Sequence, residues 1–232
     1  MIDSEDIRLL PHARMVYNSE GDTSHDVNAF IRIARRDGSY IRDLILPPGV
    51  QQTGPQGHEG IRNNLAFESV TLSPDGKRLT SGIENALRQD GPVSALGMAS
   101  PSRLLTFDLA TGKPGPEYVY MVDPIPYRTV PPGGYSDNGL SALIDEGGGQ
   151  YLALERRYMQ GHKTAFSGTG TGARIYAVDT HGATNVAGLK SLKDAHYTPV
   201  TKRLVLDLDA LHIPLDNLEG MTFGPRLPDG SR

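Results

Sequence analysis

The sequence contains no cysteine, which excludes disulfide bonds and thiolate metal sites. No apolar run approaches the ~18 to 20 residues that a membrane-spanning helix needs, so we expect no membrane span. The first residues, MIDSEDIRLL, lack the basic and apolar regions of a signal peptide. The absence of cysteine fits the cytosol as well as many exported bacterial proteins, so these features leave the compartment open.

The sequence also lacks a net positive charge and has little helical periodicity. The net charge is -4 and the basic residues form no long block, which argues against a nucleic-acid partner. Residues 185–196 are the one mild helical candidate. In contrast, 27 glycines and 17 prolines imply many turns. Between the turns lie short segments rich in Val, Ile, Leu, Tyr and Thr, and this pattern favours an all-β fold.

A repeat organises these segments. Four of them begin with a polar residue followed by apolar residues at alternate positions, and their leading residues are Glu5, Glu68, Ser141 and Glu219. After each of the first three comes a second run that ends in a glutamate, namely Glu20, Glu84 or Glu155. A third run follows as FIRIARRDG, RLLTFDLATG and RIYAVDTHG, and a fourth, less clearly, as IRDLILPP, EYVYMVDP and NVAGLKSL. Each unit therefore has four strands.

Four-stranded antiparallel units that recur in this way are typical of a β-propeller. A β-sandwich is the competing fold, but it would not require the same residue type at the same strand position in successive units. We expect a single propeller domain with blades at about 1–60, 61–135 and 136–210, and the first strand of another blade in 211–232. A closed propeller has ~4 to 8 blades, so we expect the chain to be a piece of a longer propeller, truncated at both ends.

The acidic residues occupy equivalent positions in the units. Residues equidistant from a hairpin turn face each other, which would pair Glu68 with Glu84, Glu5 with Glu20, and Ser141 with Glu155. Facing carboxylates repel each other and need a shared proton, an arginine or a bound cation. Because blades turn about one axis, we expect these acids to converge on one mouth of the channel. Solvated glutamates at strand ends are the simpler alternative.

Several motifs resemble the phytase-like domain family, which is described by an esterase-like activity of phytase. They are GIRNNLAFESVTLSPDGK, ENALRQDG, LALER and DNLEGMTFGP, and together they span most of the chain. The resemblance implies a propeller exported to the periplasm or beyond, with hydrolysis of a small phosphate ester or another anionic ester. By similarity to calcium-dependent propeller phytases, it also implies bound Ca²⁺. The chain departs from the family pattern because only Glu219 is followed by glycine; Asp6 and Ser69 take that place elsewhere.

Two functions remain open at this point: a metal-dependent phosphoester or ester hydrolase, and a non-catalytic propeller that binds a ligand or a protein partner. For the hydrolase, oxygen donors without cysteine favour Ca²⁺, with Mg²⁺ as the other possibility. The candidate catalytic residues are Glu68, Glu84, Glu155 and Glu219. The candidate metal ligands are Glu5, Glu20, Glu68, Glu84, Glu219 and Asp216. Candidate substrate contacts are Arg62, Arg156 and Asn217, although the arginines could be ordinary salt-bridge partners, and Asp216 and Asn217 ordinary turn formers.

Overall fold

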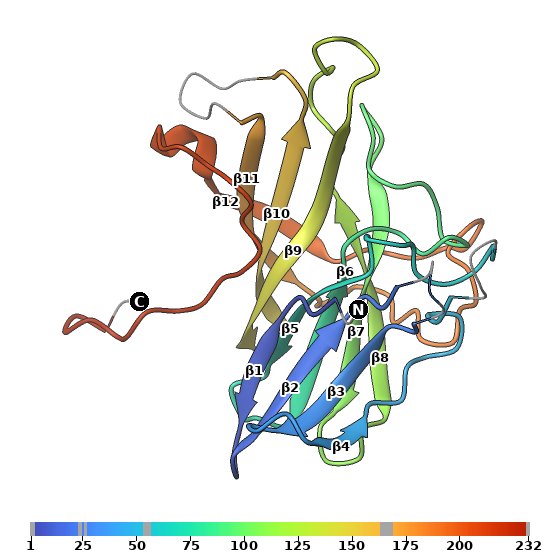
Figure 1. Ribbon diagram of the computed structural model, residues 1–232, viewed down its shortest axis with the longest axis vertical. Coiled ribbons are helices and arrows are strands. Elements are labelled where there is room, and N and C mark those ends of the chain that lie inside the picture. The colour runs from blue at the N-terminus through green and yellow to red at the C-terminus, as the bar shows by residue number, and fades with distance from the viewer. Residues whose placement is uncertain (1–2, 23–24, 26, 53–56, 163–168, 231–232) are drawn as a thin grey trace.

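The computed structural model describes residues 3–22, 25, 27–52, 57–162 and 169–230. These residues form three four-stranded antiparallel sheets, each built from four consecutive strands, which are successive blades of a β-propeller (Figure 1). Blade 1 contains β1 (Ile7–Leu10), β2 (Arg14–Ser19), β3 (Phe30–Arg35) and β4 (Tyr40–Asp43). Blade 2 contains β5 (Phe67–Leu72), β6 (Arg78–Ile83), β7 (Ser100–Asp108) and β8 (Pro114–Val122). Blade 3 contains β9 (Ser136–Gly147), β10 (Gln150–Met159), β11 (Thr171–Asp179) and β12 (Thr201–Asp207), followed by the 3₁₀ turn η2 (Leu208–Leu211).

The turn between β5 and β6 shows how the local sequence closes a hairpin. In the stretch SPDGK, the Ser73 hydroxyl donates a hydrogen bond of 2.6 Å to the Asp75 carboxylate. Gly76 adopts a φ of 68°, a left-handed conformation that glycine reaches without a steric penalty. The chain can therefore reverse within a few residues and start β6 at Arg78.

The blades meet along their first strands, because β5 lies beside both β1 and β9. Polar side chains tie the backbones together at these junctions. The buried Asn18 amide donates to the Phe67 carbonyl at 3.0 Å, and the Val70 N–H donates to the Asp6 carboxylate at 3.0 Å. Between blades 2 and 3, the Asp145 N–H donates to the Thr71 hydroxyl at 2.9 Å. These bonds fix the ends of the first strands relative to one another.

Two hydrophobic clusters fill the spaces between neighbouring sheets. One includes Ile31, Phe67 and Leu105 and lies between blades 1 and 2. The other includes Tyr120 and Leu143 and lies between blades 2 and 3. Each blade thus buries an apolar face against the next blade, as expected for alternating strands of this fold. The described residues include no helix with the length and apolar character needed to cross a membrane.

The all-β propeller fold is confirmed, but two predicted strands are wrong. NVAGLKSL (residues 185–192) is a loop, and the fourth strand of blade 3 is β12. The loop is held by hydrogen bonds to blade 2, from the Arg103 guanidinium to the Leu189 carbonyl and from the Leu192 N–H to Asp90. Its apolar residues therefore pack without a strand ladder.

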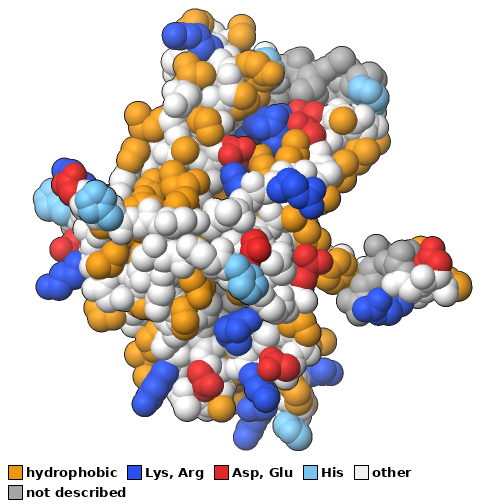
Figure 2. Space-filling model, turned by 180° about the vertical axis from the view of Figure 1, so that it is seen from behind, with side chains coloured by type: hydrophobic (Ala, Val, Ile, Leu, Met, Phe, Trp, Pro, Cys, Tyr) orange, Lys and Arg blue, Asp and Glu red, His pale blue; other side chains and the backbone are white. Residues whose placement is uncertain are grey.

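The segment that begins with Glu219 is not a strand either. No strand is assigned in the described residues after β12, and this C-terminal segment leaves the body of the sheets (Figures 1 and 2). Leu218 and Met221 pack against Ala142 and Leu154, but no backbone ladder accompanies this contact. An alternating apolar pattern specifies which side chains are buried; a strand also needs a hydrogen-bonded neighbour.

The close approach of blades 2 and 3 at Gly82 gives a test of this packing. A Cβ at Gly82 would lie 2.7 Å from Leu140 Cδ2 and 2.8 Å from Ser69 Oγ, so Gly82→Ala should overpack the junction. We expect the free energy of unfolding in urea to fall by about 1–3 kcal/mol. Gly220→Ala is the matched control, because its Cβ would meet nothing within 4 Å. Equal stability of the two variants would contradict the packing described here.

Candidate functional site

A cavity of about 690 Å³ lies where the first strands of the blades begin and the second strands end. All three blades contribute to its wall, together with the segment after η2. Its acidic lining residues are Asp3, Glu5, Glu20, Glu68, Glu84, Asp137, Asp216 and Glu219. Arg156, Asn217, Tyr135 and Tyr158 also line it. We refer to this space as the acidic cavity.

The carboxylates in the acidic cavity approach one another closely. One oxygen from each of Glu20, Glu68 and Glu84 lies within 4.8 Å of the others, and the same holds for Asp3, Glu5 and Glu20. Glu20 belongs to both groups, so it joins the acids of blade 1 to those of blade 2. Its carboxylate also accepts the Ala66 N–H at 2.5 Å, which fixes its position at the junction. Glu20, Glu68 and Glu84 are all buried.

Burial and mutual repulsion disfavour the charged forms of these groups. Desolvation raises the pKa of Glu5 to about 7, with further contributions from Asp3 and Glu219. It also raises the pKa of Glu20 to about 7, even though the Ala66 N–H works in the opposite direction. The pKa values of Glu68 and Glu84 are raised as well, first by burial and then by neighbouring carboxylates. The cavity therefore retains protons near neutral pH.

Arg156 is the cation next to these acids. Its guanidinium lies 3.7 Å from Glu84 Oε1 and lowers the pKa of that carboxyl, partly opposing the effect of burial. It also donates to the Asn217 amide oxygen at 2.5 Å, and the Asn217 amide in turn donates to Glu219. The Arg156 Nε is buried and has no hydrogen-bond partner. One arginine faces several carboxylates, so its charge cannot compensate all of them.

Irregularities in the strands, and not directly facing cross-strand pairs, bring the acidic side chains together. A β-bulge in β5 leaves Glu68 without a cross-strand partner, and the Glu84 N–H bonds to the Ala66 carbonyl at 2.7 Å. In blade 1, the Glu20 N–H bonds to the Asp3 carbonyl rather than facing Glu5. The predicted facing pairs are thus wrong in register. The side chains still converge, because bulges re-aim residues at strand ends.

Gly139 provides the space that Glu84 occupies. A Cβ built at Gly139 would collide with the Glu84 carboxylate, so the Glu84 side chain lies directly over the backbone of β9. The Leu140 N–H also donates to the Glu84 carbonyl at 3.1 Å. The start of β9 in blade 3 therefore positions an acid that belongs to blade 2.

Glu155 lies outside the acidic cavity, contrary to the prediction. The β9–β10 hairpin continues four residues past it to Met159, so Glu155 is in mid-strand, where a bulge pairs it with Leu140 instead of Ser141. Its carboxylate accepts hydrogen bonds from the Tyr120 hydroxyl, the Asp123 backbone N–H and the Asn138 side-chain amide. It also forms an ion pair with the Lys202 ammonium group at 2.5 Å. This carboxylate is therefore fully partnered by residues of blades 2 and 3.

Arg62 is also absent from the acidic cavity. Its guanidinium donates to the Ala86 carbonyl at 3.0 Å and to the Gly91 carbonyl at 2.8 Å. Burial, and then repulsion by Arg88, lowers its pKa. Arg62 holds the loop that follows β6, and this structural role takes up the donors that an anion would need.

Asp137, Tyr135 and Tyr158 line the cavity but were not predicted. Asp137 stands at the start of β9, in the position that Glu5 and Glu68 occupy near the starts of their strands. The stretch SDNG around it has the composition of a turn, so the strand pattern alone does not predict that β9 extends this far. Tyr158 lies two residues after Arg156 and therefore on the same face of β10.

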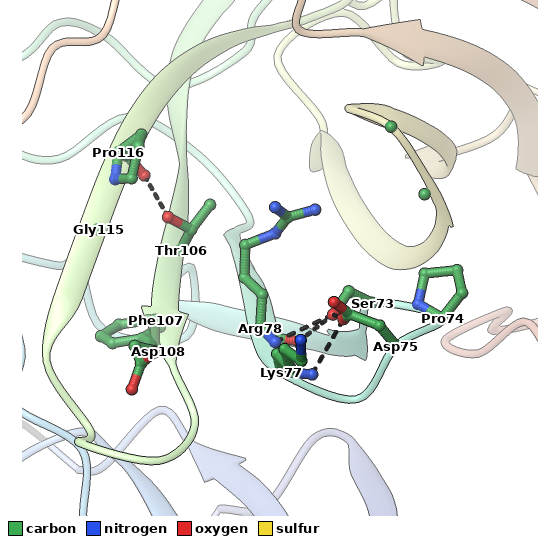
Figure 3. A pocket seen from close by; sticks show the side chains of 12 residues that line it. Ser73, Pro74, Asp75, Lys77, Arg78, Thr106, Phe107, Asp108, Gly115 and Pro116 are labelled. Carbon is green, nitrogen blue, oxygen red and sulfur yellow. Dashed lines mark hydrogen bonds between the residues drawn. The ribbon is translucent and has the colours of Figure 1, made fainter.

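A second cavity, of about 500 Å³, lies at the opposite end of blade 2 beside the β5–β6 turn (Figure 3). Its charged groups have local partners. Asp75 accepts from Ser73 and from the Lys77 N–H, and Arg78 forms a 3.3 Å ion pair with Asp145. Because these charges are compensated by neighbours, the acidic cavity is the stronger candidate for a functional site.

Comparison with known protein families gives a match over the whole chain. A family model described as "Phytase-like: Esterase-like activity of phytase" matches residues 1–232. An "Uncharacterized secreted protein" of Arthroderma benhamiae is 34% identical over 94 residues, which are 39% of this chain and 18% of that protein. The matched region is thus a small part of that relative.

Two solved structures are similar to parts of the chain. Hydrazine synthase of Kuenenia stuttgartiensis matches with a TM-score of 0.36 and 14% identity, over 75% of this chain and 38% of that one. The Dos1 propeller matches with a TM-score of 0.32 and 9% identity, over 78% of this chain and 43% of that one. The chain therefore spans less than half the length of either structure.

The raised pKa values predict how stability depends on pH when no divalent cation is present. Between about pH 4.5 and 7, the folded state binds more protons than the unfolded state at Glu5 and Glu20, so the free energy of unfolding should fall as the pH rises. Glu68→Gln removes one buried carboxyl whose ionised form is disfavoured by burial. In the presence of a chelator, we expect the free energy of unfolding of this variant to exceed that of the wild type by about 1–2 kcal/mol at pH 8 and by less at pH 5.

Urea denaturation at several pH values in chelator checks this prediction. Glu59→Gln serves as the control, because Glu59 is exposed and does not line the acidic cavity. It should follow the wild type at every pH. A wild-type protein that becomes more stable from pH 5 to pH 8 in chelator would contradict the account of the cavity.

Proposed function

The chain belongs to the phytase-like family, and on that premise we propose that it carries the site of a divalent-cation-dependent hydrolase of phosphate esters or other anionic esters. One observation carries the proposal: buried glutamates of two neighbouring blades converge in the acidic cavity with a single arginine beside them. Uncompensated buried carboxylates are costly for the fold, and groups with perturbed pKa values in a cavity mark candidate functional sites.

The donor set of the acidic cavity fits a hard cation. The donors that lie close together are carboxylate oxygens in two groups of three, and Glu20 belongs to both groups. Carboxylate oxygens suit Ca²⁺, with Mg²⁺ as the alternative. The residues that would hold the cation are Glu5, Glu20, Glu68 and Glu84, with Asp216 and Glu219 at the exposed rim. When bound, the cation would neutralise the charge of an anionic substrate and polarise its phosphoryl or carbonyl oxygen.

Arg156 and Asn217 are the proposed contacts for the substrate anion. The guanidinium lines the cavity and lies between Glu84 and Asn217. Planar guanidinium groups suit phosphate and carboxylate oxygens, because two N–H groups can donate in parallel. Arg156 would hold the anion at the rim of the acidic cavity, next to the carboxylates.

Glu68 and Glu84 are the proposed acid–base pair, with Glu219 as a third candidate at the rim. Burial and nearby carboxylates raise the pKa values of both Glu68 and Glu84, so whichever of the two does not bind the cation can hold a proton near neutral pH. A group that keeps its proton under working conditions can donate it to a leaving alcohol, and a deprotonated neighbour can accept one from water. Arg156, by lowering the pKa of Glu84, favours Glu84 as the acceptor.

Export of the protein is part of the proposal. The Arthroderma benhamiae relative bears the name of a secreted protein, and the phytase-like family resemblance also implies a periplasmic or extracellular location. The proposed substrate is a small anionic ester rather than a macromolecule. The chain matches 18% of that relative, so activity should be measured on the full-length gene product.

Phosphate release from phytate and from an aryl phosphate tests the proposed function. We expect activity with Ca²⁺, its loss by at least about a hundredfold in chelator, and recovery when Ca²⁺ is restored. Glu68→Gln and Glu84→Gln should each lower kcat by about a hundredfold, because a positioned acid or base contributes on that order. Glu59→Gln, outside the acidic cavity, should retain activity.

Different outcomes separate the two functions. Activity that survives chelation would overturn the dependence on a cation. Absence of hydrolysis on every ester, with Ca²⁺ binding retained, would overturn the enzymatic function and favour a propeller that binds a ligand or a protein partner without catalysis.

A further inference from the structure

Two tyrosines form an aromatic wall beside the carboxylates of the acidic cavity. Tyr135 and Tyr158 both line it, and their ring centroids are 6.0 Å apart with a tilt of 37° between the rings. Tyr135 comes from the segment just before β9, and Tyr158 from the end of β10. Both tyrosines line the same cavity as Glu84 and Arg156, the proposed acid–base and anion-binding groups.

Tyr135 combines high exposure with a fixed position. The residue is 61% exposed, yet its hydroxyl donates a 2.6 Å hydrogen bond to the Asp137 carboxylate. Its backbone N–H donates to the Gln160 side chain at 2.8 Å. Asp137 is itself held by the Tyr158 N–H at 3.1 Å, so both ends of the Tyr135 residue are anchored to blade 3. An exposed ring held in this way loses little conformational entropy when a ligand stacks on it.

The aromatic wall contributes little to the stability of the fold, because most of the Tyr135 surface remains in contact with solvent. Its place at the rim suits a substrate with two parts: an anionic group that enters the acidic cavity and a flat apolar group that stays outside it. Aromatic rings stack with offset or tilted geometry, and the open side of the Tyr135 ring can accept such a partner.

We propose that Tyr135, supported by Tyr158, is a specificity-determining residue that stacks on the ring of an aryl ester while the anionic group of the ester enters the acidic cavity. This inference rests on the proposed function and narrows its substrate class to anionic esters of aromatic alcohols. Tyr135 contacts the leaving group, so it should act on substrate affinity more than on the chemical step.

Binding of two unreactive analogues tests the inference separately from turnover. Phenylphosphonate and methylphosphonate carry the same anionic group but only the first has a ring. In the full-length protein with Ca²⁺, calorimetry should show phenylphosphonate bound about five- to tenfold more tightly. Tyr135→Ala should abolish this preference and leave methylphosphonate affinity unchanged, whereas Tyr135→Phe, which keeps the ring, should retain it.

Tyr127→Ala is the matched control, since Tyr127 is 56% exposed and does not line the acidic cavity. It should keep the phenyl preference. With phenyl phosphate as substrate, Tyr135→Ala should raise KM by a similar factor with little change in kcat.

The outcomes distinguish this inference from the proposed function. An unchanged phenyl preference in Tyr135→Ala, with ester hydrolysis intact, overturns the aromatic subsite alone. A phenyl preference that depends on Tyr135 without any hydrolysis supports the subsite and overturns the hydrolytic function. Failure to bind either phosphonate and to hydrolyse any ester overturns both.

Discussion

The structure depends on how buried carboxylates are compensated where two blades meet. Glu20 of blade 1 lies with Glu68 and Glu84 of blade 2, and oxygens of the three groups approach within 4.8 Å. Arg156 provides positive charge beside Glu84. Burial raises the pKa values of Glu68 and Glu84, so bound protons compensate part of the remaining negative charge. The neighbouring junction with blade 3 needs Gly139, whose missing side chain leaves room for Glu84. A cation that replaces the protons would connect the fold directly to function.

Glu155, in contrast, is a carboxylate whose negative charge is fully compensated by neighbouring groups. Its carboxylate is also buried, but Tyr120 of blade 2 and Asn138 and Lys202 of blade 3 satisfy it. Lys202 in addition lies over the Tyr176 ring, with its Nζ 4.3 Å from the centroid. A buried charge with a complete set of partners contributes to the fold. A buried charge without them, as at Glu68, indicates a site where a proton or ligand is exchanged.

The recurring alternation of polar and apolar residues was enough to predict the four-stranded units, because alternation and turn residues are local properties of the chain. It also selected Glu68 and Glu84, whose positions follow from the ends of a short hairpin. Glu155 could not be placed correctly, since the length of its hairpin depends on pairing beyond the residue itself. Asp137 was missed for the same reason. Contacts between loops, which decide what Arg62 binds, have no signature in the strand pattern of the sequence.

The central claim is that the acidic cavity exchanges protons for a divalent cation. Calorimetric titration of the full-length protein with Ca²⁺ at pH 7, in two buffers of different ionisation enthalpy, measures the protons released per cation bound. Glu5 and Glu20 have pKa values of about 7, and those of Glu68 and Glu84 are raised as well, so binding should release about one proton or more. Saturable binding without proton release, or no binding of Ca²⁺ at all, would contradict the account.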